Sequence, residues 1–267
     1  MLKGLDKTIL NDAKRIVDEA DKRGVILRIM GALAIYIHSG EFVNLYRRMG
    51  RLGDRLFTDI DLIGYSKQRK DISEVLNGLG YDMDRAIMLM FGANRGVWHH
   101  PDGLYHVDVF FDALEFSHDI RFNKGMSKGR LELDYPTLTP SDLLLEKTQI
   151  HEINEKDIKD IIVLVRAHEI SEDEKKDTIN VKYIARLLAD DWGFYYDVKE
   201  NLNKVLFFAE KYFKENLISE QDFSDIKVKI NKILECMHNE PKTKKWKKRA
   251  KKGTKKKWWR DVEEYLR

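Results

Sequence analysis

The chain has 267 residues and a formal net charge of +3. That length exceeds a typical single domain, so we expect one larger domain with a smaller partner. A lone cysteine, Cys236, excludes an internal disulfide. No apolar run approaches the roughly 18 residues of a membrane-spanning helix, and the first residues lack an apolar signal region. We therefore expect a cytoplasmic protein without a transmembrane segment.

Positive charge is concentrated near the C-terminal end. Residues 241–260 hold 12 Lys and Arg and no Asp or Glu, so the rest of the chain carries −9. Trp246, Trp258 and Trp259 lie among these cations, and phosphate neutralisation with base stacking is a common way to bind single-stranded nucleic acid. A solvated, disordered tail is the alternative. Residues 258–266 also have the spacing of a short amphipathic helix.

Helix and strand signals alternate in the first half of the chain. A helix is expected at residues 6–22, where apolar residues recur at helical spacing before Gly24. Further elements follow in order: a strand at 25–30, a helix at 31–38, a strand at 57–63, a helix at 67–79, and strands at 85–91 and 104–111. This order predicts an α/β domain, a sheet with flanking helices.

The second half of the chain has helix signals. Thr139, Pro140 and Asp142 form a helix-start pattern, and residues 154–157 repeat it. Helices are expected at 140–150, 154–169, 180–189, 194–213 and 220–238. We therefore divide the chain into residues 1–138, an α/β domain; 139–240, a helical domain; and 241–267, a basic tail rich in Trp and Lys.

Three carboxylates lie within the apolar strand patterns. Residues 57–63 read FTDIDLI, and alternation along a strand places Asp59 and Asp61 on one face. Asp108 lies in a second apolar strand that could pair alongside. Clustered like charges need compensation, and three carboxylates are the hard oxygen ligands that Mg²⁺ or Mn²⁺ prefers. Acids at a strand edge are the alternative for Asp59 and Asp61, and a solvent-facing strand residue is the alternative for Asp108.

A rival metal site would use His99, His100 and His106 with Asp108. His106 and Asp108 share a strand face, so a hydrolase site of His and Asp is conceivable. The spacing matches no zinc pattern, and adjacent residues of a strand point apart. Mixed ligands would predict dependence on a transition metal, whereas carboxylates predict activity with Mg²⁺ or Mn²⁺.

Together, several ordered motifs resemble the nucleotidyltransferase superfamily, and more narrowly its AbiEii-like toxin group. The motifs are Gly31-Ala32 at a strand-to-helix junction, TDID at 58–61, HVD at 106–108, LLLEK at 143–147 and EKDIKD at 155–160. The resemblance spans about residues 25–215. It implies the nucleotidyltransferase fold, a mixed sheet with flanking helices, followed by a helical C-terminal domain.

The resemblance also implies roles for individual residues. Asp59 and Asp61 would ligate Mg²⁺, and Asp108 would complete the metal site and help to deprotonate the attacking hydroxyl. The nucleotide-binding part would include Gly31, Ala32 and Thr58, with backbone N–H groups at the helix start holding the triphosphate. In the helical part, Lys147 would reach a phosphate, and Asp157 or Asp160 would orient it.

Two alternatives to these roles stay open. Asp157 lies at the third position of its helix, where an acid is favoured by capping, and Lys147 could be an exposed lysine. The arginines of the insertion at 39–56 could form a solvated surface or a phosphate clamp. Ala32 departs from the Gly or Ser usual in the family, so a hydroxyl contact with phosphate is absent.

The sequence thus predicts a Mg²⁺-dependent nucleotidyltransferase that transfers a nucleoside monophosphate from an NTP such as ATP to an acceptor hydroxyl and releases pyrophosphate. RNA or tRNA, bound through residues 241–260, is the favoured acceptor, and the toxin-like resemblance adds an antitoxin as a possible partner. The alternative is a non-catalytic protein that binds nucleotide or RNA on the same scaffold, which Ala32 favours and retention of three acids opposes.

Overall fold

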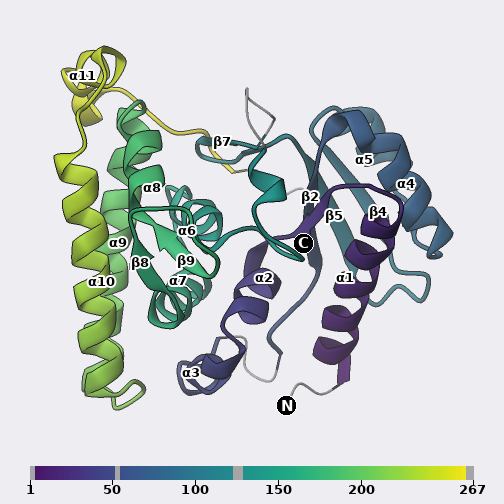
Figure 1. Ribbon diagram of the computed structural model, residues 1–267, viewed down its shortest axis with the longest axis horizontal. Helices are drawn as coiled ribbons and strands as arrows, with labels where there is room; N and C mark the ends of the chain where they lie inside the picture. Colours follow the sequence, from purple (N-terminus) through teal and green to yellow (C-terminus); the bar gives the residue numbers. More distant parts are fainter. Residues whose placement is uncertain (1–3, 52–54, 123–128, 263–267) are drawn as a thin grey trace. The chain divides into compact units, whose positions relative to one another are not determined.

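The structure, a computed structural model, describes residues 4–51, 55–122 and 129–262 (Figure 1). The chain forms two compact units. The first consists of Met1–Ile37, Leu52–Leu114 and Ile120–Leu138, and the second of His38–Arg51, Glu115–Asp119 and Thr139–Arg267.

The first unit is built on a five-stranded sheet with the order β1-β2-β5-β4-β3. The strands β2 and β5 are parallel, and the pairs β1·β2, β4·β5 and β3·β4 are antiparallel, so the sheet is mixed. Its strands are β1 (Leu27–Ile29), β2 (Ile60–Gly64), β3 (Asp82–Met83), β4 (Arg95–His99) and β5 (His106–Phe111).

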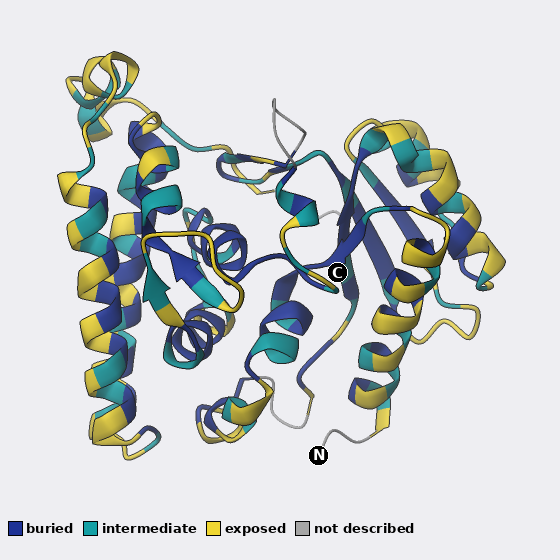
Figure 2. Ribbon diagram, in the orientation of Figure 1, coloured by how far each residue is buried: buried dark blue, intermediate teal, exposed yellow. Residues whose placement is uncertain are grey.

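The first unit also contains helices, and its core is apolar. On α1 (Gly4–Lys22), the buried residues Ile9, Ala13, Ile16, Val17 and Ala20 recur at helical spacing, which explains why this segment is an amphipathic helix. Figure 2 shows the sheet as largely buried and α1 as buried along one side. The other helices are α2 (Gly31–His38), α4 (Arg69–Gly78) and α5 (Arg85–Phe91).

The strand expected at residues 85–91 is wrong, because this segment is the helix α5. The Asp84 side chain accepts hydrogen bonds from the backbone N–H groups of Ala86 and Ile87, 3.0 and 3.1 Å long, and so caps the helix. Leu89 and Met90 are exposed to solvent, so the apolar run at 85–91 is not the buried strand that its composition suggested.

The second unit is mainly helical, as expected. Side chains that the sequence pattern marked as helix starts cap their helices: Thr139 accepts a hydrogen bond from the Asp142 N–H, and Asn154 from the Asp157 N–H. Its helices are α3 (Val43–Arg48), α6 (Pro140–Thr148), α7 (Glu155–Ala167), α8 (Val181–Leu188), α9 (Trp192–Lys214), α10 (Glu220–Asn239) and α11 (Lys244–Ala250).

Short elements complete the fold. A parallel pair in the second unit, β8 (Glu169–Ser171) and β9 (Thr178–Asn180), was not expected from the sequence. Another two-stranded sheet contains β6 (Ala113–Glu115) and β7 (Asp119–Arg121). Single 3-10 turns occur at Gly40–Phe42, Ser66–Gln68, Arg130–Glu132 and Gly253–Lys255.

A mixed sheet with flanking helices and a helical C-terminal part confirm the fold class expected from the sequence. Residues 258–262 are not helical, and the rest of the amphipathic helix expected there lies outside the described residues. In the described part of the chain, no helix has the length and apolar character needed to cross a membrane.

Candidate active site

Two of the three predicted carboxylates lie side by side on the sheet. Asp61 on β2 is the register partner of Asp108 on β5, and these strands are parallel. Paired positions of neighbouring strands project to the same face, about 4.8 Å apart along the sheet. Asp59 lies in a bend one residue before β2, and its side chain is 37% exposed. Asp61 and Asp108 thus present their carboxylates to one region of one face.

Apolar residues on the opposite face hold these strands in place. Ile60, Leu62, Val107 and Val109 alternate with the acids and are fully buried. A slip of one residue in either strand would bring the acids into the core, so burial of these side chains fixes the register. Alternation thus positions Asp61 and Asp108, whereas the expected strand face shared by Asp59 and Asp61 is wrong, because the strand begins at Ile60 and Asp59 precedes it.

Gly31 brings the start of α2 against the Asp61 carboxylate. Gly31 has φ +69°, and a Cβ atom placed there would lie 2.9 Å from Asp61 Oδ2. The Met30 N–H also donates a 2.9 Å hydrogen bond to the Asp61 backbone carbonyl. Only glycine combines this left-handed backbone with such a close approach. The first unit thus contains the predicted positions Gly31 and Ala32 at a helix start, and Thr58 is exposed beside Asp59.

Arg95 and His106 are partners of Asp108, and only His106 had been placed beside it from the sequence, on the same strand face. Asp108 Oδ1 accepts a 2.7 Å hydrogen bond from Arg95 Nε, and His106 Nε2 lies 3.2 Å from Asp108 Oδ2. Burial raises the pKa of Asp108, but hydrogen bonds from His106 and Arg95 outweigh it and hold this pKa below its usual value. The hydrogen bond to Asp108 raises the pKa of His106. His106 shared the HVD motif with Asp108, but nothing in the sequence marked Arg95.

The donor set of this site suits a hard divalent cation. Carboxylate oxygens are the ligands that Mg²⁺ and Mn²⁺ prefer, and the lack of a side chain at Gly31 lets the start of α2 lie against Asp61 Oδ2. Within the described residues, the ligand atoms of Asp59, Asp61 and Asp108 do not all lie within 4.8 Å of one another. The oxygens of Asp108 also face Arg95 and His106. Asp59 and Asp61 stay the predicted metal ligands, while Asp108 is paired with Arg95 and His106.

The other predicted residues form a separate cluster in the second unit. Lys147 Nζ lies 2.8 Å from Asp157 Oδ1 and 3.3 Å from Asp160 Oδ2. Burial lowers the pKa of Lys147, but the charges of Asp157 and Asp160 outweigh it and place this pKa above its ordinary value. Lys147 is thus a buried, ion-paired ammonium group, and the alternative of an exposed lysine is wrong.

Arg51 completes this cluster. It binds the fully buried Asp160 through both Nε and Nη2, and Arg51 Nη2 lies 2.9 Å from Asp160 Oδ2. The sequence left the arginines of the insertion open between a solvated surface and a clamp. Arg51 belongs neither to a solvated surface nor to a phosphate clamp. Its side chain is only 7% exposed, and its guanidinium forms a bidentate ion pair with Asp160. Nothing in the sequence distinguished it from the arginines beside it.

The histidines of the rival metal site have separate partners. His99 Nε2 lies 3.1 Å from Asp84 Oδ2, and His100 Nδ1 accepts a hydrogen bond from the Asp102 N–H. The His100 ring also contacts the Tyr105 ring. Of the four residues of the rival site, His106 and Asp108 are the two whose side chains pair, with Nε2 and Oδ2 3.2 Å apart.

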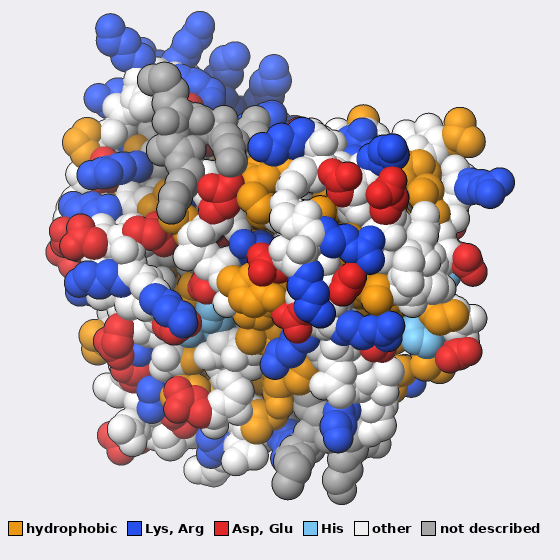
Figure 3. Space-filling model, turned by 45° about the vertical axis from the view of Figure 1, so that its right-hand side comes forward, with side chains coloured by type: hydrophobic (Ala, Val, Ile, Leu, Met, Phe, Trp, Pro, Cys, Tyr) orange, Lys and Arg blue, Asp and Glu red, His pale blue; other side chains and the backbone are white. Residues whose placement is uncertain are grey.

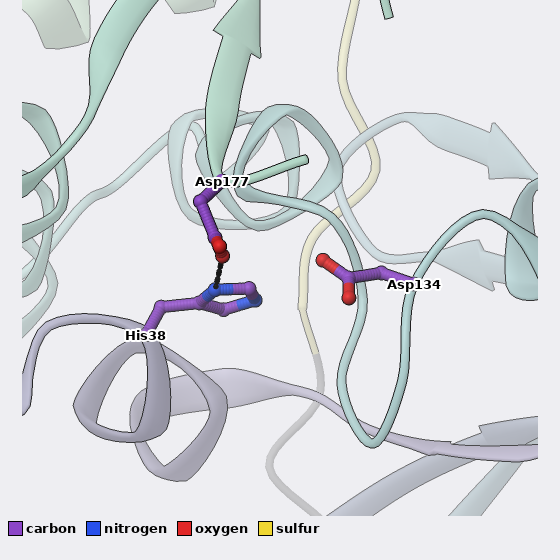
Figure 4. A group of neighbouring side chains, drawn as sticks. All are labelled: His38, Asp134 and Asp177. Atoms are coloured by element: carbon purple, nitrogen blue, oxygen red, sulfur yellow. Dashed lines mark hydrogen bonds and ion pairs between the residues drawn. The ribbon is translucent and has the colours of Figure 1, made fainter. Parts of the chain in front are cut away.

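The second unit also contains a buried histidine beside an ion pair. Figure 4 shows His38 Nδ1 pointing toward Asp177 Oδ1, 3.1 Å away; Asp134, also drawn there, belongs to the first unit. The His168 ring lies against the His38 ring, and His168 Nδ1 hydrogen-bonds the Asp177 backbone carbonyl. Burial lowers the pKa of His168 to about 4, so this ring is neutral near pH 7.

Comparisons with known proteins bear on the fold only. No protein-family model matches the chain, and no curated protein matches it. Among solved structures, the chain is similar to the antibiotic-resistance factor ANT(2'')-Ia, with 15% identity, a TM-score of 0.36 and coverage of 60% of this chain and 84% of that one. It is also similar to an antigenic nucleotidyltransferase-like protein from Paracoccidioides brasiliensis, with 12% identity, a TM-score of 0.42 and coverage of 82% and 92%. Because these values are low, we base the function on the residues of the site.

Proposed function

We propose that the protein is a metal-dependent nucleotidyltransferase. One observation carries this proposal: the carboxylates of Asp61 and Asp108 project from neighbouring parallel strands, and a helix start at Gly31 lies against Asp61. Acids beside backbone N–H groups suit a metal-bound triphosphate, because the N–H groups can hold phosphate oxygens while the acids hold the cation.

Each residue of the first unit has a role in this proposal. Asp59 and Asp61 would hold Mg²⁺ or Mn²⁺, which when bound neutralises phosphate charge and activates the α-phosphorus. Gly31 and Ala32 would offer backbone N–H groups to the triphosphate of an NTP such as ATP. Asp108, kept ionised by Arg95 and His106, would accept the proton of the attacking hydroxyl. The acceptor oxygen then bonds to the α-phosphorus, and the bond to the β-phosphate breaks to release pyrophosphate.

We propose RNA as the acceptor, because the basic residues 241–260 can neutralise phosphates. The proposed contact of Lys147 with a substrate phosphate stays a prediction. The Lys147 ammonium group is ion-paired with Asp157 and Asp160 within the second unit. The resemblance to the AbiEii-like branch and the antitoxin partner also stay predictions.

A second candidate is a non-catalytic nucleotide-binding or RNA-binding protein. The observation that favours it is the pairing of Asp108 with Arg95 and His106, because two cationic side chains already balance the charge that a catalytic metal would balance. Nucleotidyl transfer would then require Asp108 to keep its basicity despite these partners.

Transfer of label from NTP to RNA distinguishes the candidates. The purified protein is incubated with each α-labelled NTP, Mg²⁺ and total RNA, beside an Asp59→Asn/Asp61→Asn variant and an Asp102→Asn control. Asp102 is an exposed acid in a turn of the same unit. The proposal predicts labelled RNA with the wild type and the control, and a loss of at least ~100-fold in the double variant. Nucleotide binding without transfer to RNA, protein or small molecules would favour the non-catalytic candidate.

A further inference from the structure

A cavity of about 790 Å³ lies within the second unit. Three parts of the chain line it: residues 117–119, the start of α9 at residues 190–193, and the segment 245–260 that contains most of α11. The segment that the sequence showed as a basic run is therefore one wall of a concave surface.

Positive charge dominates this cavity. Seven Lys and Arg line it, against the three acids Asp119, Asp190 and Asp191. Asp190 binds Lys245 at 2.9 Å, Asp119 binds Arg260, and Asp191 caps α9 by accepting a hydrogen bond from the Phe194 N–H. All three acids are thus already engaged.

Three of the lining lysines have no such partner. Lys248, Lys252 and Lys256 are exposed, and none of them makes an ion pair with a residue in the described part of the chain. In Figure 3, Lys and Arg side chains gather at the top left of the view, the end at which Figure 1 labels α11. The cavity therefore offers ammonium groups to an anionic ligand.

Trp258 and Trp259 line the cavity, and both are anchored to neighbouring residues. Trp258 Nε1 donates a 3.0 Å hydrogen bond to the buried Asp197, and Trp259 stacks on His151 with ring centroids 3.7 Å apart. Arg249 lies over the Trp192 ring, 4.7 Å from its centroid. A Cβ atom at Gly193 would lie 3.0 Å from the Trp258 carbonyl oxygen, so the wall approaches α9 closely. These contacts hold Trp258 and Trp259 in the wall of the cavity, and the base-stacking role expected for Trp246, Trp258 and Trp259 stays a prediction.

We infer that this cavity binds the phosphodiester backbone of RNA through Lys248, Lys252 and Lys256. Ammonium groups with no acid partner gain counterion-release free energy when they neutralise phosphates. A membrane surface fits less well, because the tryptophans that could insert into lipid are packed against His151, Asp197 and α9. Because ammonium groups contact phosphates and not base edges, sequence preference is low.

This inference rests on the proposed function only for the identity of the acceptor. Binding is measured without NTP, so it succeeds or fails independently of catalysis. If RNA binds but no transfer occurs, the inference stands and the proposed function fails.

The test measures the affinity of the whole protein for a fluorescently labelled single-stranded RNA of ~20 nucleotides at several salt concentrations. The variant is Lys248→Glu/Lys252→Glu/Lys256→Glu. The control is Lys175→Glu/Lys176→Glu/Lys232→Glu, which changes the charge of the same unit equally at exposed lysines away from the cavity. Thermal unfolding of all proteins checks that the substitutions leave the fold intact.

We expect the cavity variant to bind RNA at least ~10-fold more weakly than the wild type near 100 mM salt. The slope of the logarithm of its binding constant against the logarithm of the salt concentration should be smaller by about 2. The control should retain most of the wild-type affinity. Labelled single-stranded DNA of the same length should bind similarly, because backbone contacts dominate. Equal weakening in both variants would show a net-charge effect and overturn the site. Wild-type protein that binds only phosphatidylserine vesicles, and no nucleic acid, would overturn it too.

Discussion

Gly31 determines how closely a helix start can approach a carboxylate of the site. Its φ of +69° and the 2.9 Å that would separate an added Cβ atom from Asp61 Oδ2 are independent reasons for glycine. Gly103 offers a comparison, because it has φ +66° but open space around the same position. The two glycines separate backbone strain from steric contact with the acid.

Gly31→Ala should therefore cost more than Gly103→Ala. We expect a loss of about 1 kcal/mol in the free energy of unfolding for Gly103→Ala, from backbone strain alone. For Gly31→Ala we expect roughly 2 kcal/mol or more, and at least ~10-fold lower transferase activity, because Asp61 must move. Urea unfolding and label transfer measure the two effects. Equal losses of stability and unchanged activity in both variants would contradict the role assigned to Gly31.

The lowered pKa of His168 predicts a pH dependence of stability. Its folded pKa of about 4 lies below the ordinary value near 6.5, so the unfolded chain binds a proton that the folded chain excludes. The contribution of His168 to the free energy of unfolding is complete above pH ~6.5. As the pH falls toward 4, about 3 kcal/mol of this free energy is lost.

His168→Gln should flatten this part of the stability profile. Urea unfolding between pH 7 and pH 4 measures it, and His238→Gln, at an exposed position of α10, is the control. A variant profile as steep as that of the wild type would show that another group causes the acid sensitivity.

At the scale of elements, the sequence was informative wherever a local rule decides the structure. Helix starts at Thr139 and Asn154 follow from capping side chains, and the face on which Asp61 and Asp108 lie follows from alternation. The segment 85–91 failed because its apolar run is too short to separate a strand from a helix, and the Asp84 cap decided the outcome.

The arginine partners of the site residues were not predictable. Arg95 reaches Asp108 because β4 pairs with β5, and Arg51 reaches Asp160 across about 110 residues of sequence. Such contacts depend on tertiary pairing, which composition and periodicity do not contain. The three acids, the pairing of Lys147 with Asp157 or Asp160 and the shared face of His106 and Asp108 were identifiable in advance, but Arg95 and Arg51 were not.

The Asp160 cluster connects α6, α7 and Arg51 within the second unit, so its loss should be costly. Asp160→Asn leaves Lys147 and Arg51 buried without their full counter-charge, and we expect a loss of roughly 3–5 kcal/mol in the free energy of unfolding. Glu210→Gln is the matched control, because the Glu210–Lys214 pair is mostly exposed and should change stability little. Urea denaturation measures both, and similar losses would show that the buried cluster is not special.

At the scale of the whole molecule, each unit is assembled from several stretches of the chain. The second unit includes residues 38–51 and 115–119 as well as the C-terminal half. Arg51 pairs with Asp160, and the Ser117 hydroxyl accepts a hydrogen bond from the His151 N–H. Residues from the first half of the chain are therefore part of the structure of the second.

A fragment of residues 139–267 should consequently be much less stable than the same residues in the intact protein, because it lacks Arg51 and residues 115–119. Hydrogen exchange of α7 amides measures this, and we expect protection to fall by at least ~10-fold in the fragment. The full-length protein, measured under the same conditions, is the control, since it keeps all segments. Equal protection in fragment and intact chain would contradict this account.

We propose that the carboxylate site of the first unit transfers a nucleoside monophosphate. The most direct test incubates the protein with α-labelled or γ-labelled ATP, and the other NTPs in turn, with Mg²⁺ and total RNA, beside Asp61→Asn. The account predicts that the acceptor gains label only from the α-position, only with Mg²⁺ or Mn²⁺, and not with Asp61→Asn. Label transferred from the γ-position, or α-label transferred equally by Asp61→Asn, would contradict it.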